Sequence, residues 1–329
     1  MDNITHTLTG LMMARAGLAR TTPRGGTLMM MLAANVPDID VFFGLPGGLA
    51  YMEFHRGYAH SLLLAPVMAV IPLLLAHWIR GASVSWKAWL ACLLGVLSHL
   101  ALDLTNVYGI RLLLPFSSRW LHLDITNIID PWILLIFLVA IAAPALSGLV
   151  SSEIRGRKSE GPKPAWACVA LVALLGYEGF RYTAHQRAIA VMSAYDYHDD
   201  STPRVWALPA GVSPLRWRGI VETSDAVLDV PVDLTRDFDP SLGRTAYPAP
   251  ESPALDAARA TQPFQAFARF NQLPFWRVTP VDDLVRVDLI DLRFGTPWQP
   301  GFAVATALVT PDGHVREARF GSALFGRRP

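Results

Sequence analysis

The chain of 329 residues has few cysteines, few charged residues and no excess of either sign of charge. Its two cysteines, Cys92 and Cys168, lie inside apolar runs, which excludes a disulfide framework and a zinc site built from thiolates. The formal net charge of +1 excludes the global basic field that binds nucleic acid. Charged residues make up only 17% of the chain and hydrophobic residues 52%, and the mean hydropathy is +0.32. This composition excludes a disordered chain, argues against an ordinary cytosolic enzyme, and leaves histidine and carboxylate to hold any metal.

The apolar residues are concentrated in the N-terminal half. Seven of the ninety residues in 61–150 are charged, whereas thirty-three of the 149 residues in 181–329 are charged. We therefore predict a mainly α fold, in which a polytopic transmembrane helical bundle is followed by a soluble α+β domain. The predicted domains are a membrane-embedded helical domain over 1–150, a basic loop with a further span over 151–180, and a soluble domain with antiparallel strands over 181–329.

Four apolar stretches are predicted to span the membrane. Ser61–Ile79 has 19 residues without a formal charge, which is about 28 Å of helix at roughly 1.5 Å per residue. Pro131–Val150 is a second strong span, and Ala88–Leu102 and Ala165–Tyr177 are shorter ones. Neighbouring helices can satisfy the backbone groups that Pro66 and Pro72 leave unpaired in the first of these spans.

The N-terminal residues predict a helical hairpin that dips into the membrane. Its helices are Ile4–Leu18 and Thr27–Val36, its turn is Arg20–Gly26, and the small Gly10 allows close helix packing. No basic stretch precedes the hairpin, so we do not expect a cleavable signal peptide. Lys and Arg number eight in one set of loops (Arg20, Arg24, Arg80, Lys87, Arg155, Arg157, Lys158 and Lys163) and three in the other (Arg56, Arg111 and Arg119). The positive-inside rule then predicts a multi-pass inner-membrane protein whose C-terminal domain lies on the periplasmic or extracellular side.

Histidines and carboxylates gather in the loops and helix ends on that outer side. His99 and Asp103 are four residues apart on one helix, and so are Asp2 and His6. The other candidates come from two short loops; they are Asp38, Asp40, His55 and His60. Ionisable groups at the ends of membrane helices are costly unless they serve a site, and a bound cation removes that cost.

Ordinary structural roles remain open for several of these residues. Asp2 is also a natural helix N-cap, and Asp38 and Asp40 would form an Asx-type turn after Pro37. His99 and Asp103 would form a plain hydrogen bond. Asp124 and Asp130 are kept only as supporting candidates outside the ligand set.

Up to eight candidates converge, a number that would hold one divalent cation or two, and zinc is the ion we expect. A bound cation would lower the pKa of a water molecule, and a carboxylate, Asp40 or Asp2, would accept its proton. Arg56 lies between the two loop histidines and is predicted to bind an anionic substrate group.

Five short motifs in this order carry a family resemblance. They are Asp2-Asn-Ile-Thr-His6, Pro37-Asp-Ile-Asp40, His55-Arg-Gly-Tyr-Ala-His60-Ser, Ser98-His-Leu-Ala-Leu-Asp103 with Asn106-Val-Tyr-Gly109, and Ile129-Asp-Pro-Trp132. Together they resemble the YdjM-type inner-membrane proteins, which are predicted metal-dependent hydrolases, over about residues 1–150. Members of that family are thought to be distant relatives of zinc-dependent phospholipase C, an all-helical phosphodiesterase.

The resemblance implies a set of metal ligands by motif position. These are His6, Asp38, His60, His99 and Asp103, with Asp2, Asp40 and His55 as further ligands or supporting residues. We count His55 with the ligands and Asp2, Asp40 and Arg56 with the catalytic residues. The expected activity is hydrolysis of an ester or phosphodiester bond, with a membrane lipid or a lipid-linked molecule as substrate.

The C-terminal residues lie outside this resemblance. Leu284–Phe294 alternates with period two, Phe302–Thr310 is typical of a buried strand, and the turn Pro311-Asp-Gly313 leads into a third strand, which predicts an antiparallel meander. Ala254–Phe270 is expected to be helical, and the Pro- and Asp-rich stretch 229–253 to be irregular loops. No nucleophile elbow or phosphate loop occurs there.

Two other function classes remain open. In the first, the chain is a non-enzymatic membrane scaffold with a structural metal and a C-terminal domain that binds a protein partner. In the second it is a transporter with a histidine and aspartate relay, which would require such groups deep in several spans. Only His99 clearly lies within a predicted span.

Overall fold

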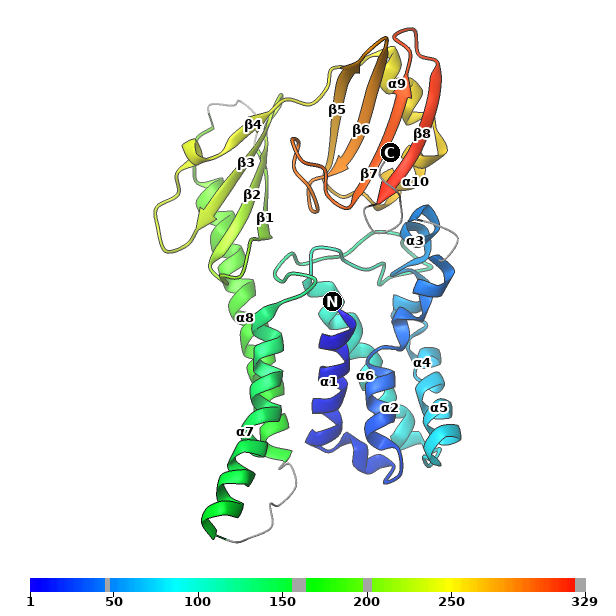
Figure 1. The fold of residues 1–329 in the computed structure, drawn as a ribbon, viewed down its shortest axis with the longest axis vertical. Helices are drawn as coiled ribbons and strands as arrows, with labels where there is room; N and C mark the ends of the chain where they lie inside the picture. Colours follow the sequence, from blue (N-terminus) through cyan, green and yellow to red (C-terminus); the bar gives the residue numbers. More distant parts are fainter. Residues whose placement is uncertain (45–47, 156–163, 198–202, 323–329) are drawn as a thin grey trace. The chain divides into compact units, whose positions relative to one another are not determined.

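The computed structural model describes residues 1–44, 48–155, 164–197 and 203–322. Its residues group into two units, Met1–Ile39 with Arg56–Ala184, and Asp40–His55 with His185–Pro329. The first unit is helical, and the second carries both β-sheets (Figure 1). Arg157, Lys158 and Lys163 of the predicted basic loop lie outside the described residues.

The helices of the N-terminal part begin and end at recognisable signals. Asp2 caps the first helix, Ser85 caps the helix Trp86–Thr105, and the left-handed Gly81 ends the helix before that one. The α-helices are α1 (Asn3–Ala16), α2 (Gly26–Ala33), α3 (Gly48–Phe54), α4 (Ala65–Met68), α5 (Val70–Arg80), α6 (Trp86–Thr105), α7 (Pro131–Arg155) and α8 (Pro164–Ser193). Short 3-10 segments lie between them: η1 (Leu18–Thr21), η2 (Val36–Gly44) and η3 (Tyr58–His60).

Small residues let α1, α2 and α6 pack side by side in the first unit (Figure 1). A Cβ atom on Gly10 would lie 2.6 Å from the Met30 carbonyl oxygen, and one on Gly95 would lie 2.7 Å from the Ala33 Cβ. These contacts are closer than real Cβ atoms allow, so glycine is required at both positions. The helical hairpin predicted at the N-terminus is confirmed as α1 and α2, joined through η1, and its dip into the membrane stays a prediction.

The predicted span over Ser61–Ile79 is an interrupted helix in the structure, and its crossing of a membrane stays a prediction. The chain turns at residues 62–64, and the helix is interrupted at Ala69, between α4 and α5. Pro66 and Pro72 explain the interruption, because each lies in a first helical turn, where its missing N–H costs no helical hydrogen bond.

Among the described residues, one helix is long and apolar enough to cross a membrane, namely α6. The number rises to three if each of two bent helix pairs counts as one span; these pairs are Gly26–Ala33 with Val36–Phe43 and Gly48–His60 with Ala65–Arg80. Part of α7, Pro131–Pro144, is a shorter apolar helix. The mainly helical class of the first unit is therefore confirmed, and a polytopic bundle stays a prediction.

The second unit contains two four-stranded antiparallel sheets, each with its strands in sequence order. One is β1 (Arg204–Pro209), β2 (Arg216–Glu222), β3 (Val227–Asp233) and β4 (Arg244–Ala246), with η4 (Pro240–Leu242) before the last strand. The other is β5 (Pro274–Val281), β6 (Leu284–Asp291), β7 (Ala303–Val309) and β8 (Val315–Ser322). Two helices pack on strands of this second sheet, α9 (Pro253–Arg259) and α10 (Gln262–Phe270) (Figure 1). The predicted antiparallel meander is confirmed in β6–β8.

The expectation of irregular loops over 229–253 is wrong for two segments, because β3 and β4 lie there. Pro231 discouraged a strand, since it cannot donate to a ladder. In the structure Pro231 pairs only with Arg218 of β2, because β4 pairs with β3 only as far as Asp229. The missing N–H of Pro231 therefore falls on an unpaired side of the strand.

Candidate metal centre

Four ionisable side chains of the first unit meet at one point. His99 and Asp103 lie one turn apart on α6, His60 ends η3, and Asp38 lies in the first turn of η2. Each offers one nitrogen or carboxylate oxygen, and these four atoms lie within 4.8 Å of one another. The side chains of His60, His99 and Asp103 are fully buried, and that of Asp38 is 11% exposed.

The separations within this cluster are those of a tetrahedral metal site. The Nε2 atoms of His60 and His99 are 3.2 Å apart, and each lies 3.4 Å from Asp103 Oδ2. Asp38 Oδ1 lies 3.4 Å from His60 Nε2 and 3.6 Å from His99 Nε2. A tetrahedral ion with bonds of about 2.0–2.2 Å places its ligand atoms about 3.3–3.6 Å apart. Five of the six separations in the cluster therefore fit one divalent cation in tetrahedral coordination, and the sixth, between Asp38 and Asp103, is within 4.8 Å.

Hydrogen bonds orient two of these ligands toward the common point. His99 Nδ1 donates to the Ala34 carbonyl oxygen at 2.8 Å, which leaves the Nε2 lone pair facing the cluster. Asn3 Nδ2 donates to Asp38 Oδ2 at 2.8 Å, which leaves Oδ1 of that carboxylate toward His60 and His99. Asn3 belongs to the motif Asp2-Asn-Ile-Thr-His6, but no feature of the sequence indicated that it orients Asp38, which only this hydrogen bond shows.

Asp103 is the most strongly held of the four. Its Oδ1 accepts from Arg56 Nη2 at 2.9 Å and from Asn106 Nδ2 at 3.3 Å, and the N-terminal amine of Met1 also contacts it. Its Oδ2 is buried and has no hydrogen-bond partner among the described residues. A buried carboxylate oxygen without a partner is costly, and a cation at the centre would satisfy it.

His6 lies beside the four-atom cluster. Its ring stacks on that of His99, with centroids 3.7 Å apart, and its Nε2 lies 3.4 Å from Asp103 Oδ1. The residue is fully buried, and neither ring nitrogen has a hydrogen-bond partner in the part of the chain that the structure describes. The two ring nitrogens of His6 are therefore available to a molecule that binds beside this cluster.

The other predicted site residues have different surroundings. Asp2 forms the N-cap of α1, with Oδ1 accepting from the N–H groups of Ile4 and Thr5. Asp40 and His55 both belong to the second unit, where His55 Nδ1 lies 2.8 Å from Asp40 Oδ1. Arg56, predicted to bind a substrate anion, is 3% exposed and instead donates to Asp103.

The two supporting candidates, which lie between α6 and α7, make other contacts in the first unit. Asp130 caps α7, because its Oδ1 accepts from the Trp132 N–H, and it also accepts from the Tyr177 hydroxyl at 3.1 Å. Asp124 forms an ion pair with His122, with Oδ1 and Nδ1 2.8 Å apart. The contacts of Asp130 are those of a helix cap, and those of Asp124 are those of a largely buried ion pair.

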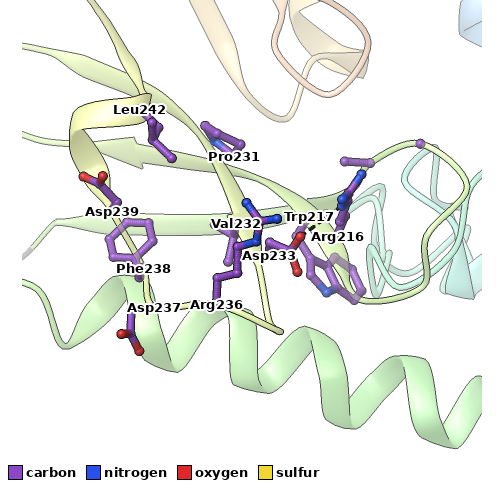
Figure 2. Close-up of a pocket in the computed structure, with 12 residues that line it drawn as sticks. Arg216, Trp217, Pro231, Val232, Asp233, Arg236, Asp237, Phe238, Asp239 and Leu242 are labelled. Atoms are coloured by element: carbon purple, nitrogen blue, oxygen red, sulfur yellow. Dashed lines mark hydrogen bonds and ion pairs between the residues drawn. The ribbon is translucent and has the colours of Figure 1, made fainter.

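The second unit has a cavity of about 470 Å³ beside β2 and β3 (Figure 2). Its carboxylates serve local turns and ion pairs. Donation by the Thr235 hydroxyl and N–H, and then by Arg216, lowers the pKa of Asp233 to about 2. Asp239 accepts from the Ser241 N–H and hydroxyl. None of the described residues that line the cavity is histidine or cysteine, so the metal-binding candidate remains the cluster of the first unit.

Comparisons with known proteins show which family the N-terminal residues match. A family model described as "YdjM inner membrane protein" matches residues 1–187. A relative from Bacillus subtilis (strain 168), described as "Uncharacterized protein YfhP", is 26% identical over 313 residues, which is 89% of this chain and 87% of the relative. No solved structure matches the chain significantly. The similarity to the Bacillus protein is long enough to include much of the C-terminal unit.

Proposed function

The chain belongs to the YdjM inner membrane protein family, and on that premise we propose that it is a membrane-bound, metal-dependent hydrolase. Its proposed substrate is an ester or phosphodiester of a lipid or a lipid-linked molecule. The observation that supports this most is the buried set of four ligand atoms from Asp38, His60, His99 and Asp103 at tetrahedral spacing.

Two imidazoles and two carboxylates form a donor set that suits zinc. A divalent cation bound there would activate water for attack and neutralise the negative charge that develops on the cleaved group. The protein holds the His99 imidazole in one tautomer through Ala34 and directs Asp103 Oδ2 inward through Arg56. The sequence led us to expect one or two ions, and we propose that one of them binds at this cluster.

His6 favours a reactive centre over a sealed one. Its ring nitrogens are buried and lack hydrogen-bond partners among the described residues. A closed structural site would leave both nitrogens without a partner, which is costly, whereas a site that admits a substrate or water would supply one. We assign His6 to the binding of a substrate oxygen or a water molecule beside Asp103. Asp40 stays our predicted proton acceptor, whereas the cap contacts of Asp2 and the ligand contact of Arg56 give both of these residues supporting roles.

We propose a multi-pass location in the inner membrane with the metal centre at the periplasmic side. The apolar α6 supports this, because its last turns carry His99 and Asp103. The greater number of Lys and Arg in the alternate loops supports the orientation. A centre at the membrane surface would meet lipid head groups directly.

The test uses the full-length protein purified in mild detergent. Metal content is measured by mass spectrometry, and product release is measured with a panel of phospholipids and lipid-linked phosphates. We expect stoichiometric metal and turnover in the wild type, and loss of both in His99→Ala and Asp103→Ala. Unchanged stoichiometric metal in both variants would refute the assignment.

His77→Ala is a matched control for His99→Ala. His77 Nδ1 donates to the Ala82 carbonyl oxygen at 2.8 Å, the same distance as the bond from His99 to Ala34. Both substitutions therefore remove a histidine and one bond to the backbone, but only one removes a proposed ligand. We expect His77→Ala to keep the metal content and turnover of the wild type.

A structural metal in a non-enzymatic scaffold is the second candidate. It is favoured by the four protein atoms that already complete a tetrahedron, because catalytic sites usually keep one position open for water. This candidate predicts that a chelator unfolds the protein and that no substrate in the panel is cleaved. The hydrolase predicts turnover that is lost on chelation and restored by added metal.

A further inference from the structure

Arg56 combines two features that are unfavourable alone. Its φ of 57° is in the left-handed region, which is strained for a residue with a Cβ atom. The residue is also only 3% exposed, so its guanidinium charge is removed from water. A strained and buried cation persists only where its surroundings hold it in place.

Those surroundings are the end of α6 and the loop that follows. The guanidinium donates from Nη2 to Asp103 Oδ1, and from Nη1 to Asn106 Oδ1 at 3.1 Å and the Gly109 carbonyl oxygen at 3.2 Å. It also stacks over the Tyr108 ring, 4.5 Å from the centroid. These four contacts all come from residues 103–109, a segment that begins at the proposed ligand Asp103.

These contacts divide the two oxygens of Asp103 between different tasks. Oδ1 receives Arg56, Asn106 and the N-terminal amine of Met1, whereas Oδ2 has no hydrogen-bond partner among the described residues and lies 3.4 Å from both His60 Nε2 and His99 Nε2. A carboxylate held in this way presents one oxygen to a cation. Arg56 is the charged side chain that donates to Oδ1, so without it this oxygen would be held less firmly, by Asn106 and the Met1 amine, and would be freer to turn toward the cation.

We propose that Arg56 is a positioning residue that makes Asp103 a ligand through one oxygen only, and thereby sets the affinity and the coordination number of the metal centre. The inference rests on the metal-binding part of the proposed function and is independent of hydrolysis. Arg56 acts through the ligand carboxylate and has no role at the substrate.

Whether metal affinity rises or falls on removal of Arg56 distinguishes a role in orienting Asp103 from a purely electrostatic effect of its charge. A positive charge beside the centre repels a cation, so removing Arg56 would strengthen metal binding if charge were its whole effect. Loss of a group that orients a ligand weakens binding, typically about 10- to 100-fold. We therefore expect Arg56→Ala to bind metal about 10- to 100-fold more weakly than the wild type.

The experiment measures Zn²⁺ affinity by competition with a chelator, and the visible absorption of the Co²⁺-loaded full-length protein in detergent. We expect the intense tetrahedral Co²⁺ band of the wild type to weaken in Arg56→Ala, because a second oxygen of Asp103 raises the coordination number. Guanidinium ion added to Arg56→Ala should bring the Zn²⁺ affinity and the Co²⁺ band back toward those of the wild type. Arg119→Ala, which removes the same charge from an exposed position of the next loop, should change neither.

Asn106→Leu keeps the inference testable if Arg56→Ala does not fold. It removes the second donor to Asp103 Oδ1 and one acceptor of Arg56, so a smaller loss of affinity in the same direction is expected. Equal or stronger metal binding with an unchanged Co²⁺ spectrum in the folded variant would overturn the inference. A wild type that binds no metal would instead refute the proposed function.

Discussion

Replacing Asp38 by asparagine should destabilise the protein much more with a bound cation than without one. In the cation-free protein, the carboxylates of Asp38 and Asp103 offer oxygens within 4.8 Å of each other. Two unit charges at that separation repel by about 3.5 kcal/mol at an effective dielectric constant of about 20. Arg56 offsets part of this repulsion at Asp103. Asp38 also accepts from Asn3 Nδ2 and lies 3.4 Å from His60 Nε2, which offsets the rest of the repulsion, so we expect cation-free Asp38→Asn to be close in stability to the cation-free wild type.

With the cation bound, the same substitution removes a ligand. A wild type at a metal concentration of about 1,000 Kd gains about 4.1 kcal/mol from binding. A variant that binds about 100-fold more weakly gains only about 1.4 kcal/mol at the same metal concentration. The metal-linked stabilisation of Asp38→Asn should thus be smaller by about 2.7 kcal/mol.

The assay is thermal and denaturant unfolding of the full-length protein in one detergent, first with a chelator and then with fixed excess Zn²⁺. Asparagine keeps the shape of Asp38 and an oxygen that can accept from Asn3 Nδ2, so packing changes little. An equal change in the free energy of unfolding under both conditions would refute the reasoning, because a purely structural role of Asp38 does not depend on metal.

Two further predictions concern packing and pH. Gly10→Ala should destabilise the protein by about 1–3 kcal/mol, because the new Cβ would lie 2.6 Å from the Met30 carbonyl oxygen; Gly179→Ala, whose Cβ would meet no atom within 4 Å, should be neutral or stabilising in thermal unfolding. Asp233 has a pKa of about 2, lowered first by donation from Thr235, so its contribution to stability is present above the unfolded pKa near 4 and is lost as the pH falls toward 2. Asp233→Asn should therefore reduce the change in denaturant midpoint between pH 5 and pH 2, and a variant with the full wild-type change would contradict this.

Local patterns were enough to predict several elements and the residue types of the site. The spacing of four residues places His99 and Asp103 on one face of any helix, and the structure has them one turn apart on α6. Period-two alternation in the sequence identified β6, although burial does not alternate along this strand, because residues 287–291 are buried on both faces. The five motifs were also specific enough to indicate the family.

Convergence of the ligands was decided only by the tertiary structure. Asp2 and Asp38 are chemically alike and both lie near helix starts, yet one caps α1 and the other joins His60 and His99. That difference depends on how closely α1, α2 and α6 approach, and contacts between residues far apart in the chain leave no periodic trace in the sequence. Arg56 shows the same limit, because its partners follow it by about fifty residues. Residue type and spacing specify which groups are able to bind a cation, whereas long-range packing selects which of them meet.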